Sequence, residues 1–151
     1  MIRTAATLAA FGLLATPALA QDFEAPLKAR QGMFNILSIN LGIIGDMAKG
    51  ETDYDADAAQ AAADSIVGVS MVNPAPLFPE GSDNAAIEGT RALPAIWEDL
   101  DDVVSKWNAL GDAATNLQEV AATGQEALGP ALGQVGNACK ACHDEYRASD
   151  N

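Results

Sequence analysis

Apolar side chains recur every three or four residues along four stretches of this chain, separated by short polar or glycine-containing segments. In the first stretch, for example, Leu37, Leu41 and Ile44 follow this step. Such a period places the apolar residues on one face of a helix. The pattern predicts helices over residues 23–49, 55–70, 93–121 and 125–146.

Turn-forming residues mark the breaks between these helices. Gly50 ends the first helix, and residues 52–55 are expected to form a turn and the cap of the second. Residues 73–84 contain three prolines and a glycine, and therefore predict the longest loop. Pro130 falls just inside the last helix, which we expect to start near Gln125 with a local distortion.

The pattern as a whole predicts an all-α fold. No segment alternates with the period of two that is typical of strands, and only 5% of the residues are aromatic. Four helices with mostly short connections favour an antiparallel up-down-up-down four-helix bundle.

The first twenty residues differ from the rest and have the three parts of a secretory signal peptide. Arg3 supplies a positive start, residues 5–15 are mostly apolar, and residues 18–20 form a small-x-small cleavage signal. A membrane anchor is the alternative, but this run is shorter than the about 20 apolar residues that span a bilayer. We expect cleavage after Ala20, a mature bundle domain over 21–151 and a periplasmic location.

The charge is strongly negative. The chain has 21 acidic and 8 basic residues, for a formal charge of −13, and cleavage removes one base and no acid, which leaves −14. Such a surface repels nucleic-acid phosphates and anionic lipid, so neither a nucleic acid nor a membrane is an expected partner. No later segment is apolar enough to span a membrane.

Both cysteines and the only histidine fall within five residues, as Cys139-Lys140-Ala141-Cys142-His143. Cys-x-x-Cys-His is the attachment pattern of haem c. The two thiols lie one helical turn apart, so both can reach one edge of the macrocycle and form thioethers with its vinyl groups. The adjacent imidazole of His143 is then the expected iron ligand.

Three other uses of these residues fit the sequence less well. A thioredoxin-like redox pair expects a strand before its helix, and none is predicted here. A zinc site built from Cys and His lacks a fourth ligand. A structural disulfide between Cys139 and Cys142 would leave the adjacent His143 unexplained. One covalent haem c is therefore the expected cofactor.

Together with this motif, several segments resemble the cytochromes c′. They are Ala29-Arg30-Gln31, Asn40-Leu41-Gly42, residues 47–51, 76–79, Ile96-Trp97 and 139–147. The resemblance implies a four-helix bundle, one covalent haem and an iron that is typically five-coordinate and high-spin. It also implies binding of NO and CO, electron transfer with an unidentified redox partner, and a homodimer through the first two helices.

The same resemblance assigns further cofactor-binding residues. Arg30 is expected to pair with a haem propionate, and Phe34, one turn later, to pack over the open side of the iron. Arg147, one turn after His143, is expected to be a cation on the proximal side. Gln31 and Arg91 are weaker candidates for the haem edge.

A low-spin electron carrier of the cytochrome c-556 type is the rival interpretation. Relatives of that type carry a ligating methionine where this chain has Phe34, and the adjacent Met33 would then have to be the sixth ligand. Met33 lies about 100° round the helix from Phe34 and is more simply a core or subunit-contact residue. The sequence contains no distal acid–base group and no second metal site, so no enzymatic turnover is expected.

Overall fold

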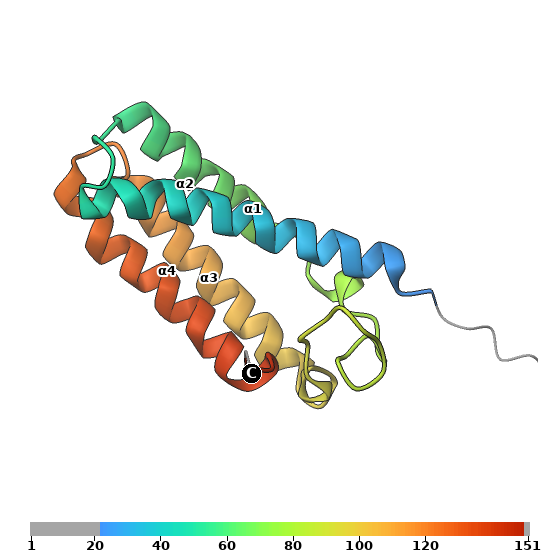
Figure 1. Ribbon diagram of the computed structural model, residues 1–151. Coiled ribbons are helices and arrows are strands. Elements are labelled where there is room, and N and C mark those ends of the chain that lie inside the picture. Colours follow the sequence, from blue (N-terminus) through green and yellow to red (C-terminus); the bar gives the residue numbers. More distant parts are fainter. Residues whose placement is uncertain (1–21, 150–151) are drawn as a thin grey trace, which may run out of the picture.

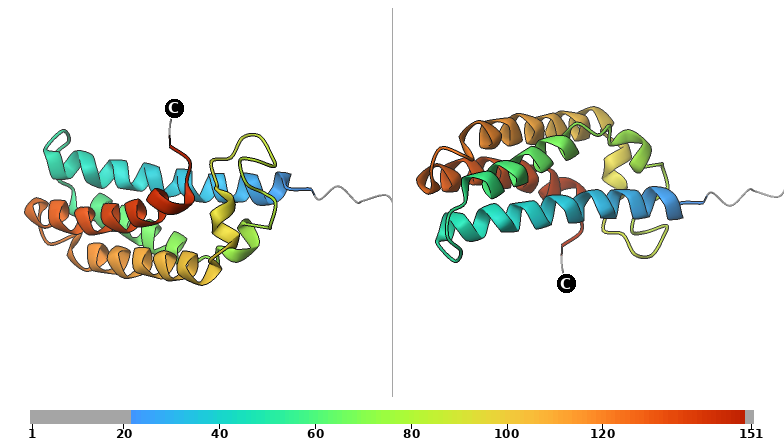
Figure 2. Two further views of the ribbon diagram at one scale, coloured as in Figure 1. Left: turned by 90° about the horizontal axis from the view of Figure 1, so that it is seen from below. Right: turned by 90° about the horizontal axis from the view of Figure 1, so that it is seen from above.

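A computed structural model describes residues 22–149 of the chain. Its helices are α1 (Glu24–Lys49), α2 (Ala56–Ser70), α3 (Leu100–Val120) and α4 (Gln125–Tyr146), with short 3₁₀ helices η1 (Ala75–Leu77) and η2 (Pro94–Trp97) between α2 and α3. The helices alternate in direction, and each packs against its two neighbours in the order α1, α2, α3, α4 and back to α1 (Figures 1 and 2). The predicted up-down-up-down bundle is confirmed.

The observed helix ends follow from local capping. The Asp55 carboxylate accepts a hydrogen bond from Ala58 N (3.0 Å) at the start of α2. Gly50 ends α1 with φ at +73°, a left-handed conformation that favours glycine. The predicted cap of the second helix is therefore confirmed, and α4 starts at Gln125 as expected. Pro130 lies inside α4, and the distortion expected there stays a prediction.

The prediction for the third helix was wrong at its beginning. We expected it to start near residue 93, whereas α3 begins at Leu100. Leu93 is extended (ψ 150°) because it precedes Pro94, and η2 then makes one short turn. The carboxylate of Asp99 caps α3 by accepting from Asp102 N (3.0 Å). The connection between α2 and α3 therefore spans 71–99 and is longer than the predicted 73–84 loop.

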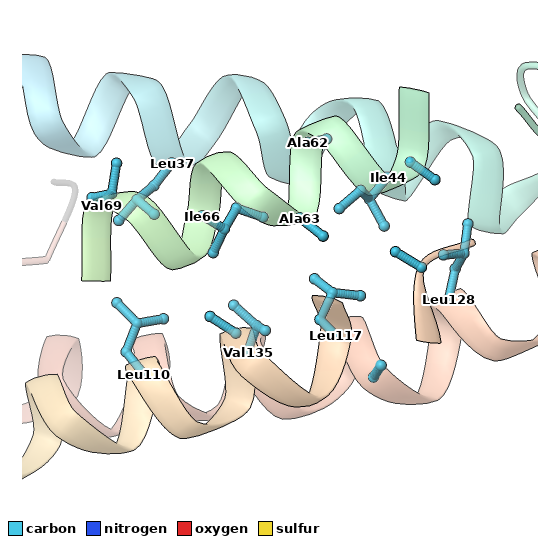
Figure 3. Close-up of a cluster of buried hydrophobic side chains, with 14 of the residues drawn as sticks. Leu37, Ile44, Ala62, Ala63, Ile66, Val69, Leu110, Leu117, Leu128 and Val135 are labelled. Atoms are coloured by element: carbon cyan, nitrogen blue, oxygen red, sulfur yellow. The ribbon is translucent and has the colours of Figure 1, made fainter. Parts of the chain in front are cut away.

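The main core runs along the bundle between the α1–α2 and α3–α4 pairs (Figure 3). We call it the first cluster; its fully buried members include Ile44, Ile66, Leu117, Leu128 and Val135. Three buried alanines of α2, Ala59, Ala62 and Ala63, allow the neighbouring helices to approach closely. None of the helices within residues 22–149 is both long and apolar enough to cross a membrane.

A smaller second cluster lies where the 71–99 segment meets the start of α3 and the end of α4. It contains buried Ala92, Ile96 and Tyr146, with Phe78, Ala95, Trp97, Val103 and Cys142 packed against them. Here the 71–99 segment also pairs with the end of α4 through an isolated antiparallel bridge between Ala92 and Arg147. This end of the bundle therefore brings together residues from distant parts of the sequence.

Candidate functional site

The two cysteines lie on the last turns of α4 and have free thiols. Cys139 packs against the first cluster and Cys142 against the second, so the pair lies between the two apolar regions. Burial raises the pKa of both thiols, which keeps them protonated at neutral pH. Their spacing of three residues places them on one side of the helix.

His143 follows directly on the same helix and is partly exposed. Burial lowers the pKa of its imidazole, and the positive charge of Arg91 lowers it further, while Asp144 acts in the opposite direction. The imidazole is therefore neutral at pH 7, which is the protonation state that binds a metal. Arg91, one of the weaker sequence candidates, is thus electrostatically coupled to His143.

Phe34 lies opposite His143, on α1. The centroids of the two rings are 6.5 Å apart, with planes inclined by 62°. Phe34 also packs edge-on against Trp107 of α3, at 6.3 Å between centroids, and remains 37% exposed. Met33, in contrast, is only 6% exposed and belongs to the first cluster. The structure thus brings Phe34 to the histidine and places Met33 in the core.

Arg30 is buried one turn before Phe34, where its guanidinium binds the 71–99 segment. It donates to Ser82 Oγ (2.8 Å), Ser82 O (2.7 Å), Thr90 Oγ1 (2.6 Å) and, at 3.4 Å, Leu77 O. Its charge also lies 5.0 Å from the centroid of the Phe78 ring. These contacts fasten the segment to α1. The pairing of Arg30 with a propionate stays a prediction.

The other two candidates also lie at this end of the bundle. Gln31 donates from Nε2 to Gly89 O (2.7 Å), which is a second link from α1 to the same segment. Arg147 lines an open cavity of about 290 Å³ together with His143, Asp144, Ala148 and Ser149. Both arginines near the histidine, Arg91 and Arg147, make further interactions.

Sequence reasoning missed two groups of polar residues at this end. Ser82 and Thr90 receive the Arg30 guanidinium, and no periodicity or motif marks them. Tyr146 donates to Asp102 Oδ2 (2.7 Å), and no sequence pattern pairs these two residues. Tyr146 lies in the 139–147 segment that resembles the cytochromes c′, but nothing in the sequence indicates its partner.

The residues at this site fit a covalent haem. Two free thiols stand one turn apart, a neutral imidazole adjoins them, and an aromatic ring faces it from α1. A small cavity of about 60 Å³ nearby has apolar walls, contributed by Pro74, Ala75, Phe78, Ile96 and the first turns of α3. Cys139, Cys142 and His143 would hold the group, and the apolar walls would exclude water from it.

Comparisons with known proteins agree with this chemistry. The sequence model of the family described as cytochrome c′ matches residues 25–147. Cytochrome c-554 of Cereibacter sphaeroides is 41% identical over 143 residues, covering 93% of this chain and 94% of that protein. Cytochrome c′ of the same species is 39% identical over 134 residues, covering 89% and 90%. A solved cytochrome c′ from Rhodobacter Spheriodes, 38% identical, gives a TM-score of 0.82 and covers 86% of this chain and 100% of that one. This chain therefore belongs to the cytochrome c′ family, the four-helix-bundle proteins that carry one covalent haem c.

Proposed function

We propose that this chain is a periplasmic haem c protein in which His143 is the only protein ligand of a five-coordinate, high-spin iron. It binds NO and CO on the side of Phe34 and exchanges electrons with a redox partner that is still to be identified. The observation that carries the proposal is the phenyl ring of Phe34 opposite His143, because a phenyl group cannot bind iron.

Different residues of the chain would attach the haem, coordinate its iron and restrict access to it. The Sγ atoms of Cys139 and Cys142 would hold the haem covalently, and the neutral imidazole of His143 would be its protein ligand. When bound, the haem supplies one-electron redox chemistry and a coordination position for small gases. The side chains of Phe34 and Trp107 line the side of the site opposite His143 and restrict which molecules can enter it.

The surroundings of Phe34 favour NO over O₂. Bound O₂ is stabilised by a hydrogen-bond donor on the distal side. The one histidine of the chain is the proximal ligand, and Trp107 Nε1 donates to Val72 O (3.0 Å). Neither residue offers such a donor, whereas NO binds ferrous haem strongly without one.

Relatives support gas binding, and one group of them represents the rival. Solved variants of the cytochrome c′ of Alcaligenes xylosoxidans, 30% and 31% identical to this chain, are described with bound NO and with bound carbon monoxide. A cytochrome c-556 of Agrobacterium tumefaciens is 34% identical. The low-spin alternative would require Met33 to leave the first cluster and bind iron, which its burial disfavours.

A ferrous absorption spectrum, with and without CO, tests the proposal. We expect a broad, weak visible band that changes on CO addition. Phe34→Ala should speed CO binding in stopped-flow measurements, and Phe34→Met should move the spectrum toward low spin. Met33→Leu is the matched control and should change neither, since it nearly conserves volume. A sharp low-spin α band that Met33→Leu abolishes would show that the rival is correct.

Export rests on residues 1–20, which lie outside the described part of the chain. We propose that they are removed after Ala20 and that haem is attached in the periplasm. Intact mass of the haem-loaded protein should correspond to a start at Gln21. A haem-loaded protein that retains Met1 would contradict this assignment.

A second copy of this chain is the partner proposed for α1 and α2. Ile36, Ile39 and Ile43 are 48%, 64% and 39% exposed and follow one face of α1. A solved cytochrome c′, 33% identical, is described as showing ligand-controlled dimer dissociation. Sedimentation should show a dimer that Ile39→Glu converts to monomer, while Thr115→Glu on α3 leaves it unchanged. A wild-type monomer at micromolar concentration would rule out this interface.

A further inference from the structure

The last turn of α4, which carries His143, is fastened on two sides. On the backbone side, Leu93 N donates to Tyr146 O (3.0 Å) and Ala148 N donates to Arg91 O (2.8 Å). These bonds surround the bridge between Ala92 and Arg147. The chain that leaves α4 is therefore paired with the segment that precedes η2.

On the side-chain side, the hydroxyl of Tyr146 donates to Asp102 Oδ2 (2.7 Å) in the first turn of α3. The same carboxylate oxygen pairs with Lys106 Nζ (3.0 Å), which also lies 3.4 Å from Glu145 Oε1. Tyr146 is 7% exposed, and the Lys106 side chain is 18% exposed. Two residues of α4 are thus tied to two residues of α3 by a connected network that is buried at Tyr146 and exposed at Glu145.

The electrostatics of the network agree with its geometry. The hydrogen bond to Asp102 is the main cause that raises the pKa of Tyr146, and the same bond is the main cause that lowers the pKa of Asp102. The neutral phenol and the ionised carboxylate are therefore the stable pair around neutral pH. A charge-assisted bond of this kind is stronger than one between neutral groups.

We propose that Tyr146, held by Asp102, is a positioning residue that sets the direction in which His143 presents its imidazole. Tyr146 lies three residues after His143 on one helix, so a bond that fixes the tyrosine fixes the rotation of the turn that carries the histidine. Cys142 packs in the same second cluster as Tyr146, so the thioether position is fixed with it. The inference rests on the proposed function, in which His143 is the only protein ligand.

The test compares two substitutions that each remove one phenolic hydroxyl. Tyr146→Phe breaks the bond to Asp102, and Tyr54→Phe is the matched control, because Tyr54 donates to Ala121 O (3.0 Å) at the opposite end of the bundle. Resonance Raman of the ferrous haem-loaded protein reports the iron–histidine stretch, and amide hydrogen exchange reports the opening of residues 143–147. The haem content of each variant is measured as well.

In Tyr146→Phe we expect the iron–histidine band to broaden and move to lower frequency at unchanged haem content. Exchange of the 143–147 amides should become about tenfold faster, as expected when one partly buried, charge-assisted hydrogen bond is lost. Tyr54→Phe should change neither. Asp102→Asn, which keeps an oxygen acceptor for the phenol, should give a smaller band shift than Asp102→Ala.

Two outcomes separate the failure of this inference from the failure of the proposed function. Faster exchange in Tyr146→Phe with an unchanged iron–histidine band would show that the bond is merely structural, and would overturn the inference alone. A wild-type ferrous protein with a six-coordinate low-spin spectrum would overturn the proposed function and, with it, the positioning role.

Discussion

At one end of the bundle the helices are joined by two short turns, residues 50–55 and 121–124, whereas at the other end the long 71–99 segment connects α2 to α3 (Figure 1). We call the end with the two short turns the closed end. Hydrogen bonds there include Tyr54 Oη to Ala121 O (3.0 Å) and Gln125 Nε2 to Met47 O (2.8 Å). We call the end with the 71–99 segment and His143 the site end. Its segments are joined by hydrogen bonds from Arg30, from Tyr146 and from Trp97 Nε1, which donates to Phe78 O (3.0 Å).

The difference follows from what each end has to do. The closed end and the middle of the bundle pack apolar residues against one another, so alanine and leucine suffice. The site end leaves large apolar side chains partly exposed, among them Phe34, Leu100 and Val104. A surface of this kind suits a large apolar cofactor, and its frame therefore has to be held by long-range hydrogen bonds rather than by self-packing.

The largest loss of unfolding free energy is expected from a substitution in the apolar core. Leu117→Ala removes a fully buried side chain of α3 next to Leu128 and Ile44 (Figure 3), at a cost of about 2–5 kcal/mol. Urea unfolding of the ferric protein measures the loss, and the ferrous–CO spectrum should remain that of the wild type. Met71→Ala, at a side chain 80% exposed, is the control and should cost less than about 1 kcal/mol. Equal losses would contradict the assignment of the core.

A smaller loss of stability, localised to the site end, is expected from Arg30→Met. The substitution removes four hydrogen bonds to the 71–99 segment and leaves buried oxygens of Ser82 without their donor, at a cost of about 2 kcal/mol. Hydrogen exchange of residues 82–92 should accelerate, while that of α2 should not.

Lys28→Met is the control for Arg30→Met. Lys28 lies two residues before Arg30 on the same helix and forms an exposed ion pair with Glu24. Such a pair contributes little, so stability should change by less than about 1 kcal/mol. If Arg30 acted only on a haem propionate, the 82–92 amides would keep wild-type exchange in Arg30→Met.

Ser82→Ala removes a single acceptor from the same group and should cost about 1 kcal/mol. Ser65→Ala is the control, since the Ser65 hydroxyl is exposed and bonds only within α2, to Ala61 O. A double-mutant cycle of Ser82→Ala with Arg30→Met measures the coupling by urea unfolding. Additive losses would show that the two side chains do not interact.

The same contrast explains how far sequence reasoning reached. The four helices were predicted because buried residues such as Ile44 and Leu128 recur with the helical period, and capping residues such as Asp55 mark the ends. The attachment motif and the resemblance to the cytochromes c′ were recognisable because adjacent residues carry them. The family assignment drawn from them is confirmed.

The architecture between α2 and α3 could not be predicted in the same way. The apolar residues Ile96 and Trp97 continue the helical spacing of α3, so periodicity alone extended that helix backward across Pro94 and the Asp99 cap. The partners of Arg30 lie about fifty to sixty residues later in the chain, and a hydroxyl or carbonyl acceptor has no local signal. Side-chain bonds that join distant segments become visible only once the helices are assembled.

The smallest expected effect is the pH dependence of the bond between Tyr146 and Asp102. Because this bond lowers the folded-state pKa of Asp102, its contribution to stability is present above the unfolded value of about 4 and is lost as the pH falls through the folded value. Because the bond raises the pKa of Tyr146, the contribution is full below the unfolded value of about 10 and is lost as the pH rises toward the folded value.

The difference in unfolding free energy between the wild type and Tyr146→Phe should therefore be constant between about pH 5 and 9 and should narrow on both sides. Asp64→Asn supplies the comparison, because hydrogen bonds from Gln118 and Gln60 lower the pKa of Asp64 and no tyrosine takes part. Its difference from the wild type should narrow on the acid side alone. Urea unfolding across this pH range measures both series. A Tyr146→Phe difference in unfolding free energy that stays constant to pH 11 would show that the phenol does not donate a hydrogen bond to the Asp102 carboxylate.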